Sequence, residues 1–104
     1  MLEDPVAVVE KRNFRLGDPL PSGGNINQFE TLSLYKIDPS DLYSYSKGEL
    51  RILRNAIYAM HHYDFDSPDL QDYFGNFKGY SPITKYPDLS STEQYNVNLI
   101  KSYE

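Results

Sequence analysis

The chain has 104 residues, which suffices for one small domain with a single modest core. Ten Lys and Arg side chains face 15 Asp and Glu, and the net charge of −5 argues against binding to nucleic-acid phosphates or to an anionic membrane surface. No run approaches the roughly 20 apolar residues that span a bilayer, and the absence of cysteine excludes disulfides, thiol nucleophiles and zinc–thiolate sites. We therefore predict no nucleic-acid partner and no transmembrane segment.

The first third of the chain differs from the rest, because all ten tyrosines lie beyond residue 34. Residues 5–9 form a short apolar run rich in valine that is typical of a strand, and weak alternation in residues 26–37 indicates a second strand. The Gly- and Pro-rich residues 17–24 are typical of a linker. We expect residues 1–31 to be an N-terminal extension or linker with a short strand.

Residues 32–104 are predicted to form a helical domain, since helix-start signals recur along them. Asp38 and Ser67 each precede a proline, which places a capping side chain ahead of a residue suited to the first helical position. Short helices are expected to follow, the first ending near residue 42. The second is expected to end at Gly75 in a left-handed conformation.

Two capping boxes predict the longer helices, one formed by Ser46 with Glu49 and one by Ser90 with Glu93. The first box opens a central helix from about Lys47 to His62. The predicted fold is mainly α, with three to four short helices around this central helix and a short β element near the N-terminus. The apolar stripe of the central helix consists of Leu50, Leu53, Ile57 and Met60 or His61.

The central helix and the residues that follow it contain a recognisable pattern, which consists of Arg54, Asn55, Ile57, Tyr58, Ala59, His61, Tyr73, Phe74, the loop 80–82 and the closing segment 89–101. This pattern resembles the YARHG domain family over residues 33–104. Met60 stands where the family usually has arginine, His62 where it has glycine, and Gly79 where an aromatic residue precedes the tyrosine. The resemblance implies a small, mostly helical, non-catalytic domain of extracytoplasmic bacterial proteins, often attached to other domains.

The polar pair Arg54 and Asn55 is open to two interpretations. A guanidinium offers a planar fork of donors to a carboxylate, and an amide can both donate and accept, so the pair could bind a ligand. Alternatively, the two side chains tie the central helix to the loops around it. Tyr58, His61, Tyr73 and Phe74 are predicted to be structural, and Phe65 is expected inside with three of these rings.

The cluster of His61, His62 and Asp64 contains side chains that bind zinc. Adjacent helical residues point about 100° apart, however, so the two histidines would not face one metal within a helix. A metal-dependent hydrolase that uses these residues is therefore a remote alternative. We expect no metal, no cofactor and no enzymatic activity, because the serines at 46, 67 and 90 are interpreted as helix caps and no nucleophile elbow is present.

Tyr80 and Tyr86 lie with Phe77 on a proline-bracketed loop that we expect to present an exposed aromatic face. Such a face could stack on sugar rings or contact a protein partner. We therefore predict a non-enzymatic binding or accessory module of the bacterial cell envelope, in the periplasm or at the cell surface, that recognises cell-wall glycan or a protein. The alternative is a structural protein–protein interaction domain cut from a longer chain.

Overall fold

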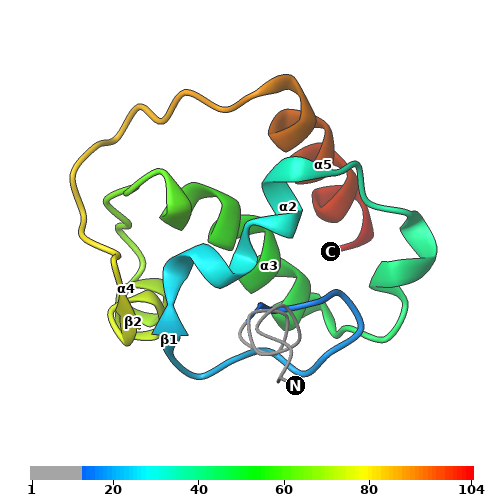
Figure 1. Cartoon of the computed structure of the whole chain (residues 1–104), viewed down its shortest axis with the longest axis horizontal. Coiled ribbons are helices and arrows are strands. Elements are labelled where there is room, and N and C mark those ends of the chain that lie inside the picture. Colours follow the sequence, from blue (N-terminus) through cyan, green and yellow to red (C-terminus); the bar gives the residue numbers. More distant parts are fainter. Residues whose placement is uncertain (1–12) are drawn as a thin grey trace, which may run out of the picture.

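The computed structural model of the chain describes residues 13–104, so the strand expected at residues 5–9 lies outside the described residues. The described part is mainly α-helical, and α3 lies in the middle with the other elements around it (Figure 1). This arrangement confirms the predicted fold class. The α-helices are α2 (Thr31–Leu34), α3 (Lys47–Met60), α4 (Pro68–Phe74) and α5 (Ser91–Tyr103); the 3₁₀ helices are η1 (Ile26–Phe29) and η2 (Pro39–Leu42); β1 (Gly24–Asn25) pairs in parallel with β2 (Phe77–Lys78).

The central helix α3 begins as its capping box predicts. The hydroxyl of Ser46 accepts from the amide of Glu49 at 3.1 Å, and the Glu49 carboxylate accepts from the amide of Ser46 at 2.9 Å. The helix ends at Met60, two residues before the predicted end, with His61 as its C-cap. Its buried face carries Leu50, Leu53, Ala56, Ile57 and Ala59.

The strand predicted within residues 26–37 is wrong, because these residues form η1 and α2 instead. The side chain of Asn25 accepts from the amide of Asn27 at 2.8 Å and caps the first turn of η1. Ile26, Phe29 and Leu32 are all buried, and their spacing of three residues suits a helical rather than an extended backbone.

The end of α4 also differs from its prediction. Gly75 is the C-cap of this helix, but its φ of −63° is right-handed, so the expected left-handed conformation is wrong. A Cβ atom built on this residue would lie 2.8 Å from the carbonyl oxygen of Gln71, which is closer than real Cβ contacts allow. Glycine is therefore required here by a close approach to the preceding turn.

Aromatic rings connect the described N-terminal segment with the rest of the core. Phe14 contacts Phe29 with ring centroids 5.3 Å apart, and Phe29 contacts Phe77 at 5.6 Å. The series continues from Phe77 to Phe74 at 6.1 Å and from Phe74 to Phe65 at 5.2 Å. All five rings are buried, so residues on both sides of position 31 pack into the same core.

Residues 80–89, named here the arm, connect β2 to α5 around the outside of α3 (Figure 1). The carbonyl oxygen of His62 accepts from the amides of Ile83 and Thr84 at 2.9 and 3.1 Å, and the amide of Asp64 donates to Thr84 at 2.8 Å. These backbone hydrogen bonds fix the arm against the segment that follows α3.

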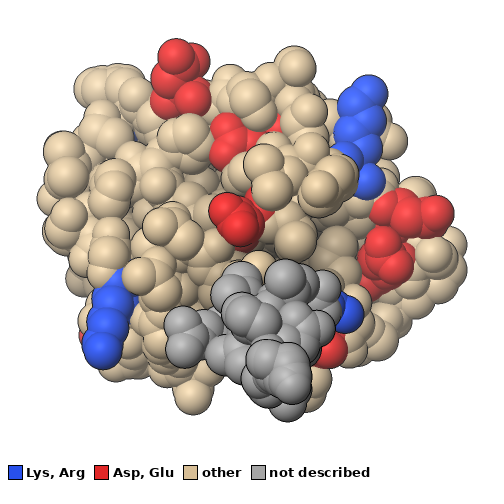
Figure 2. Space-filling view, viewed as in Figure 1, with Lys and Arg blue, Asp and Glu red and all other residues tan. Residues whose placement is uncertain are grey.

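The charged side chains on the face shown in Figure 2 do not form a basic patch, because Lys and Arg stand apart from one another on the described part of that face. Within residues 13–104, no helix has the length and apolar character needed to cross a bilayer.

Candidate functional site

Arg54, the first polar residue of the signature run, pairs with the end of α5. Its Nε and Nη2 atoms donate to the two carboxylate oxygens of Glu104 at 2.5 and 3.0 Å. Both side chains are mostly buried, and the hydrogen bonds to Glu104 raise the pKa of the Arg54 guanidinium. This two-pronged pair joins the central helix to α5.

Asn55 is buried and bonds within its own helix, since its Nδ2 atom donates to the carbonyl oxygen of Arg51 at 2.8 Å. Among residues 13–104, no hydrogen bond joins its side chain to a surrounding loop. The neighbouring signature ring, Tyr58, is half-buried and lies against Tyr63 with centroids 5.7 Å apart.

His61 contacts a carboxylate that sequence reasoning assigned only to a helix cap. Its Nε2 atom lies 2.8 and 2.9 Å from the two oxygens of Glu93, which also accepts from the hydroxyl of Ser33 at 2.7 Å and from the amide of Ser90 at 2.8 Å. Burial raises the pKa of Glu93, but the hydrogen bonds from Ser33, Ser90 and His61 outweigh burial, so the pKa lies below its ordinary value. The network joins α2, α3 and α5.

His62 has a φ of +62°, and it is the only non-glycine residue with positive φ among residues 13–104. The family usually has glycine at this position, and the left-handed backbone supplies the physical reason, because glycine adopts it without a Cβ clash. The Nδ1 atom of His62 is buried and has no hydrogen-bond partner within the described part of the chain.

The aromatic pair at the end of α4 is also structural in its contacts. Phe74 is fully buried, and the hydroxyl of the half-buried Tyr73 donates to the carbonyl oxygen of Pro21 at 2.5 Å. Burial raises the pKa of Tyr73 to about 12. Arg54, His61 and Tyr73 of the signature thus each connect two segments of the chain.

Asn96 is a structural residue that sequence reasoning missed. Its side chain is fully buried in α5, accepts from the amide of Ile37 at 2.9 Å and donates to the carbonyl oxygens of Leu32 and Tyr35 at 2.8 Å each. It satisfies the backbone groups at the end of α2. No local pattern marks it, because its partners lie about sixty positions away in the sequence.

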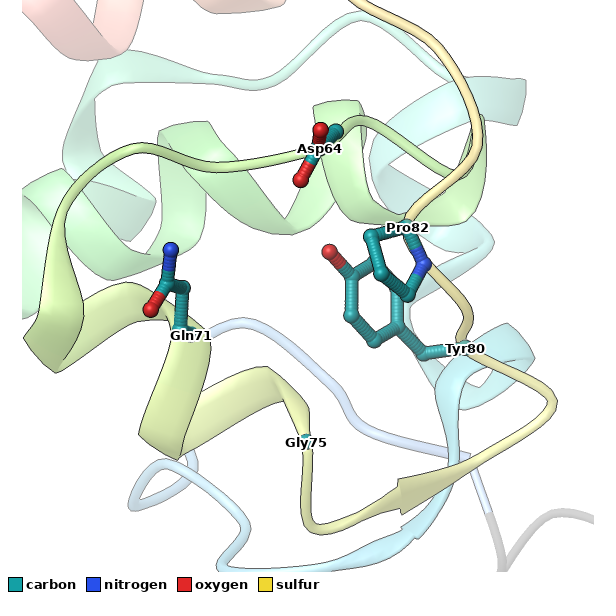
Figure 3. A pocket seen from close by; sticks show the side chains of 5 residues that line it. All are labelled: Asp64, Gln71, Gly75, Tyr80 and Pro82. Atoms are coloured by element: carbon teal, nitrogen blue, oxygen red, sulfur yellow. The ribbon is translucent and has the colours of Figure 1, made fainter.

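A pocket of about 290 Å³ lies between α4 and the start of the arm (Figure 3), and none of the residues in the network of Glu93 lines it. The side chains that line it come from three segments: the strand-like residues after α3, the helix α4 and the loop after β2. The ring of Pro82 lies beside the ring of Tyr80 in Figure 3. The lining residues are Asp64, Gln71, Gly75, Tyr80 and Pro82.

Hydrogen bonds hold the polar lining of the pocket in place. The hydroxyl of Tyr80 donates to the carbonyl oxygen of Tyr63 at 2.6 Å, and Nε2 of Gln71 donates to the carbonyl oxygen of Phe65 at 2.7 Å. Burial, with a further contribution from the charge of Asp64, raises the pKa of Tyr80, so this hydroxyl keeps its proton. The pocket is therefore preorganised.

The carboxylate of Asp64 forms the charged wall of the pocket. Its Oδ2 atom lies 3.6 Å from Nζ of Lys85, and the same ammonium lies 2.7 Å from Oδ1 of Asp66. One cation is thus shared by two carboxylates, and the group of three side chains carries a net negative charge.

The expected aromatic face of Tyr80, Tyr86 and Phe77 does not form as one surface. Phe77 is only 3% exposed and belongs to the core, so its predicted exposure is wrong; the reason is that its strand pairs with β1 and directs the ring toward Phe29 and Phe74. Tyr80 is half-buried and lines the pocket, whereas Tyr86 is 89% exposed on the arm.

The residues considered for metal binding are not arranged as a metal site. Within residues 13–104, no group of three or more His, Cys, Asp or Glu side chains is placed to hold a metal ion. His61 is engaged by Glu93, and Asp64 lies beside Lys85.

Comparison with known protein families shows which family the chain resembles. A family model described as the YARHG domain matches residues 27–104 of the chain. No curated protein and no solved structure matches it.

Proposed function

Because the chain belongs to the YARHG domain family, a family of non-catalytic extracytoplasmic modules, we propose that it is a non-enzymatic binding module of the bacterial cell envelope. Its ligand is cell-wall glycan, and the ligand site is the pocket beside Tyr80. The signature residues Arg54, Asn55 and His61 hold the fold that positions this pocket.

The observation that carries the proposal is the composition of the pocket. An aromatic ring and a proline ring supply apolar surface, and fixed polar groups lie beside them in Asp64 and Gln71. Binding sites for small molecules commonly combine apolar walls with a few polar groups that fix the orientation of the ligand. Sugar rings present both an apolar C–H face and hydroxyl donors, so this lining suits them.

Co-sedimentation with purified insoluble peptidoglycan tests the proposal. Asp64→Ala is expected to lower the bound fraction several-fold, because it removes the charged acceptor of the pocket. Asp66→Ala is the matched control, since Asp66 also pairs with Lys85 but does not line the pocket, and it is expected to bind like the wild type. Tyr86→Ala is a second control. No binding by the wild-type chain, or equal losses in Asp64→Ala and Asp66→Ala, would refute the proposal.

A second candidate function, a structural interaction domain, draws on the outer surface of the arm. Ile83 is 70% exposed and Tyr86 is 89% exposed on this segment, and exposed apolar side chains of this size are typical of protein interfaces. Sedimentation velocity of the full chain, alone and as the Ile83→Ser, Tyr86→Ser double variant, tests self-association through the arm. A monomeric wild type at high concentration argues against it.

A further inference from the structure

We propose that the pocket beside Tyr80 selects uncharged sugar rings and rejects rings that carry a carboxylate; this inference rests on the glycan-binding role proposed above for the same pocket. The selectivity follows from which hydrogen-bonding groups of the lining remain free and from the charge around them.

The free polar groups of the pocket are mostly acceptors. The single hydrogen of the Tyr80 hydroxyl is used in the bond to Tyr63, so only its lone pairs remain. The ionised carboxylate of Asp64 is an acceptor alone. Gln71 uses one hydrogen of its amide on Phe65 and keeps its carbonyl oxygen and one remaining hydrogen. A ligand must therefore supply donors, as sugar hydroxyls do, and an acceptor-only carboxylate would find a single N–H to meet it.

The charge around the pocket has the same consequence. Asp64 and Asp66 share the one ammonium of Lys85. The adjacent helix α4 contains no Lys or Arg and carries two carboxylates, Asp69 and Asp72, of which Asp69 is paired with Arg51 on α3 at 2.6 Å. An anionic ring would enter a negative field, and like charges brought together disfavour binding.

A cationic ligand would be attracted less strongly to Asp64 than to an unpaired carboxylate, because Lys85 already lies beside Asp64. A neutral sugar hydroxyl can donate a hydrogen bond to Asp64 even though the charge of this carboxylate is shared with Lys85. With a volume of about 290 Å³, the pocket lies at the small end of the range for ligand sites, so it suits one sugar ring rather than several.

A matched pair of ligands tests the selectivity. Methyl glycosides of glucose, galactose and mannose are titrated into the full chain beside their uronate counterparts, which replace the 6-hydroxymethyl group by a carboxylate. Binding is followed by ¹H–¹⁵N chemical shifts at low ionic strength. We expect the neutral ring to bind about tenfold or more tightly than its uronate, with the difference shrinking in high salt.

Two variants separate local from general charge effects. Asp64→Asn is expected to reduce the ratio of the affinity for the neutral glycoside to the affinity for its uronate to about threefold or less, because it removes the charge in the pocket wall. Asp41→Asn removes the same unit of charge from η2, which packs against α5 and does not line the pocket, and is expected to leave the ratio of the two affinities unchanged. Equal or tighter binding of uronates by the wild type would overturn the inference and leave the glycan-binding role intact. Failure of every sugar to bind would overturn both.

Discussion

The Nε2 atom of His61 lies within 2.9 Å of both carboxylate oxygens of Glu93, although the two residues are 32 positions apart. The histidine that gives the signature one of its letters therefore holds the end of α3 against the start of α5. Glu93 serves two purposes, because it completes the capping box of α5 and also accepts from Ser33 on α2. The fold thus explains this pair of polar residues without any chemistry on a substrate.

Glu93→Ala is expected to lower the free energy of unfolding by about 1–3 kcal/mol, because it removes a buried carboxylate and leaves the half-buried side chains of His61 and Ser33 without their shared partner. Glu49→Ala is the matched control, since Glu49 completes the equivalent capping box at an exposed site, where the expected loss is about 0.5–1 kcal/mol. Urea unfolding of both variants measures the difference. Equal losses would contradict the role of the network.

The stability is expected to depend on pH through the same carboxylate. The pKa of folded Glu93 lies below its ordinary value of 4.5, so the contribution of the ionised carboxylate is complete above pH 4.5 and is lost as the pH falls through the folded pKa. Urea unfolding between neutral and acid pH should show this decline. The free energy of unfolding should fall less steeply with decreasing pH in Glu93→Gln than in the wild type. Parallel curves for the two proteins would contradict this role of the Glu93 carboxylate.

Arg54→Met is expected to destabilise the fold by about 1–3 kcal/mol, since it removes a two-pronged, partly buried pair and leaves Glu104 without its guanidinium. Arg51→Met makes the same chemical change at a more exposed pair with Asp69, where solvent screens the interaction and a smaller loss of stability is expected. Thermal unfolding distinguishes the two. An unchanged melting temperature for Arg54→Met would support the alternative of a ligand contact.

His62→Gly is expected to stabilise the chain by about 0.5–1 kcal/mol, because glycine adopts the left-handed backbone without a Cβ clash, and the gain exceeds the entropy that glycine loses on folding. Gly79, with a φ of +84°, provides the reverse test. Gly79→Ala is expected to destabilise by about 1 kcal/mol. Loss of stability in His62→Gly would mean that the imidazole makes a contribution larger than the backbone strain.

The helix starts could be predicted from the sequence because each cap is a contact between residues two or three positions apart. The boxes at Ser46 and Ser90 and the cap at Asp38 form as expected. Ser67 is an N-cap by position, but its side chain accepts no capping hydrogen bond, which shows that a suitable residue type does not guarantee the contact.

The site could not be predicted in the same way, because its parts meet only through tertiary packing. Phe77 looks like a loop residue in the sequence, yet its pairing with Gly24 directs it into the core. The sequence presents Asp64 as a candidate metal ligand, and Gln71 and Pro82 carry no local signal that they share a pocket with Tyr80. The period of three residues at Ile26, Phe29 and Leu32 was a usable signal for helix, obscured by the β-type alternation between them.

A backbone ¹H–¹⁵N shift map of the full chain, recorded on addition of a soluble, neutral peptidoglycan fragment, tests most directly whether the pocket beside Tyr80 binds glycan. Arg54 and His61 bind carboxylates of α5 and hold the core, whereas the pocket that is proposed to hold the ligand has a different lining. Shifts are expected to centre on Asp64, Gln71 and Tyr80, with Arg54 and His61 unaffected. Shifts centred on Arg54, Asn55 and His61 instead would contradict it.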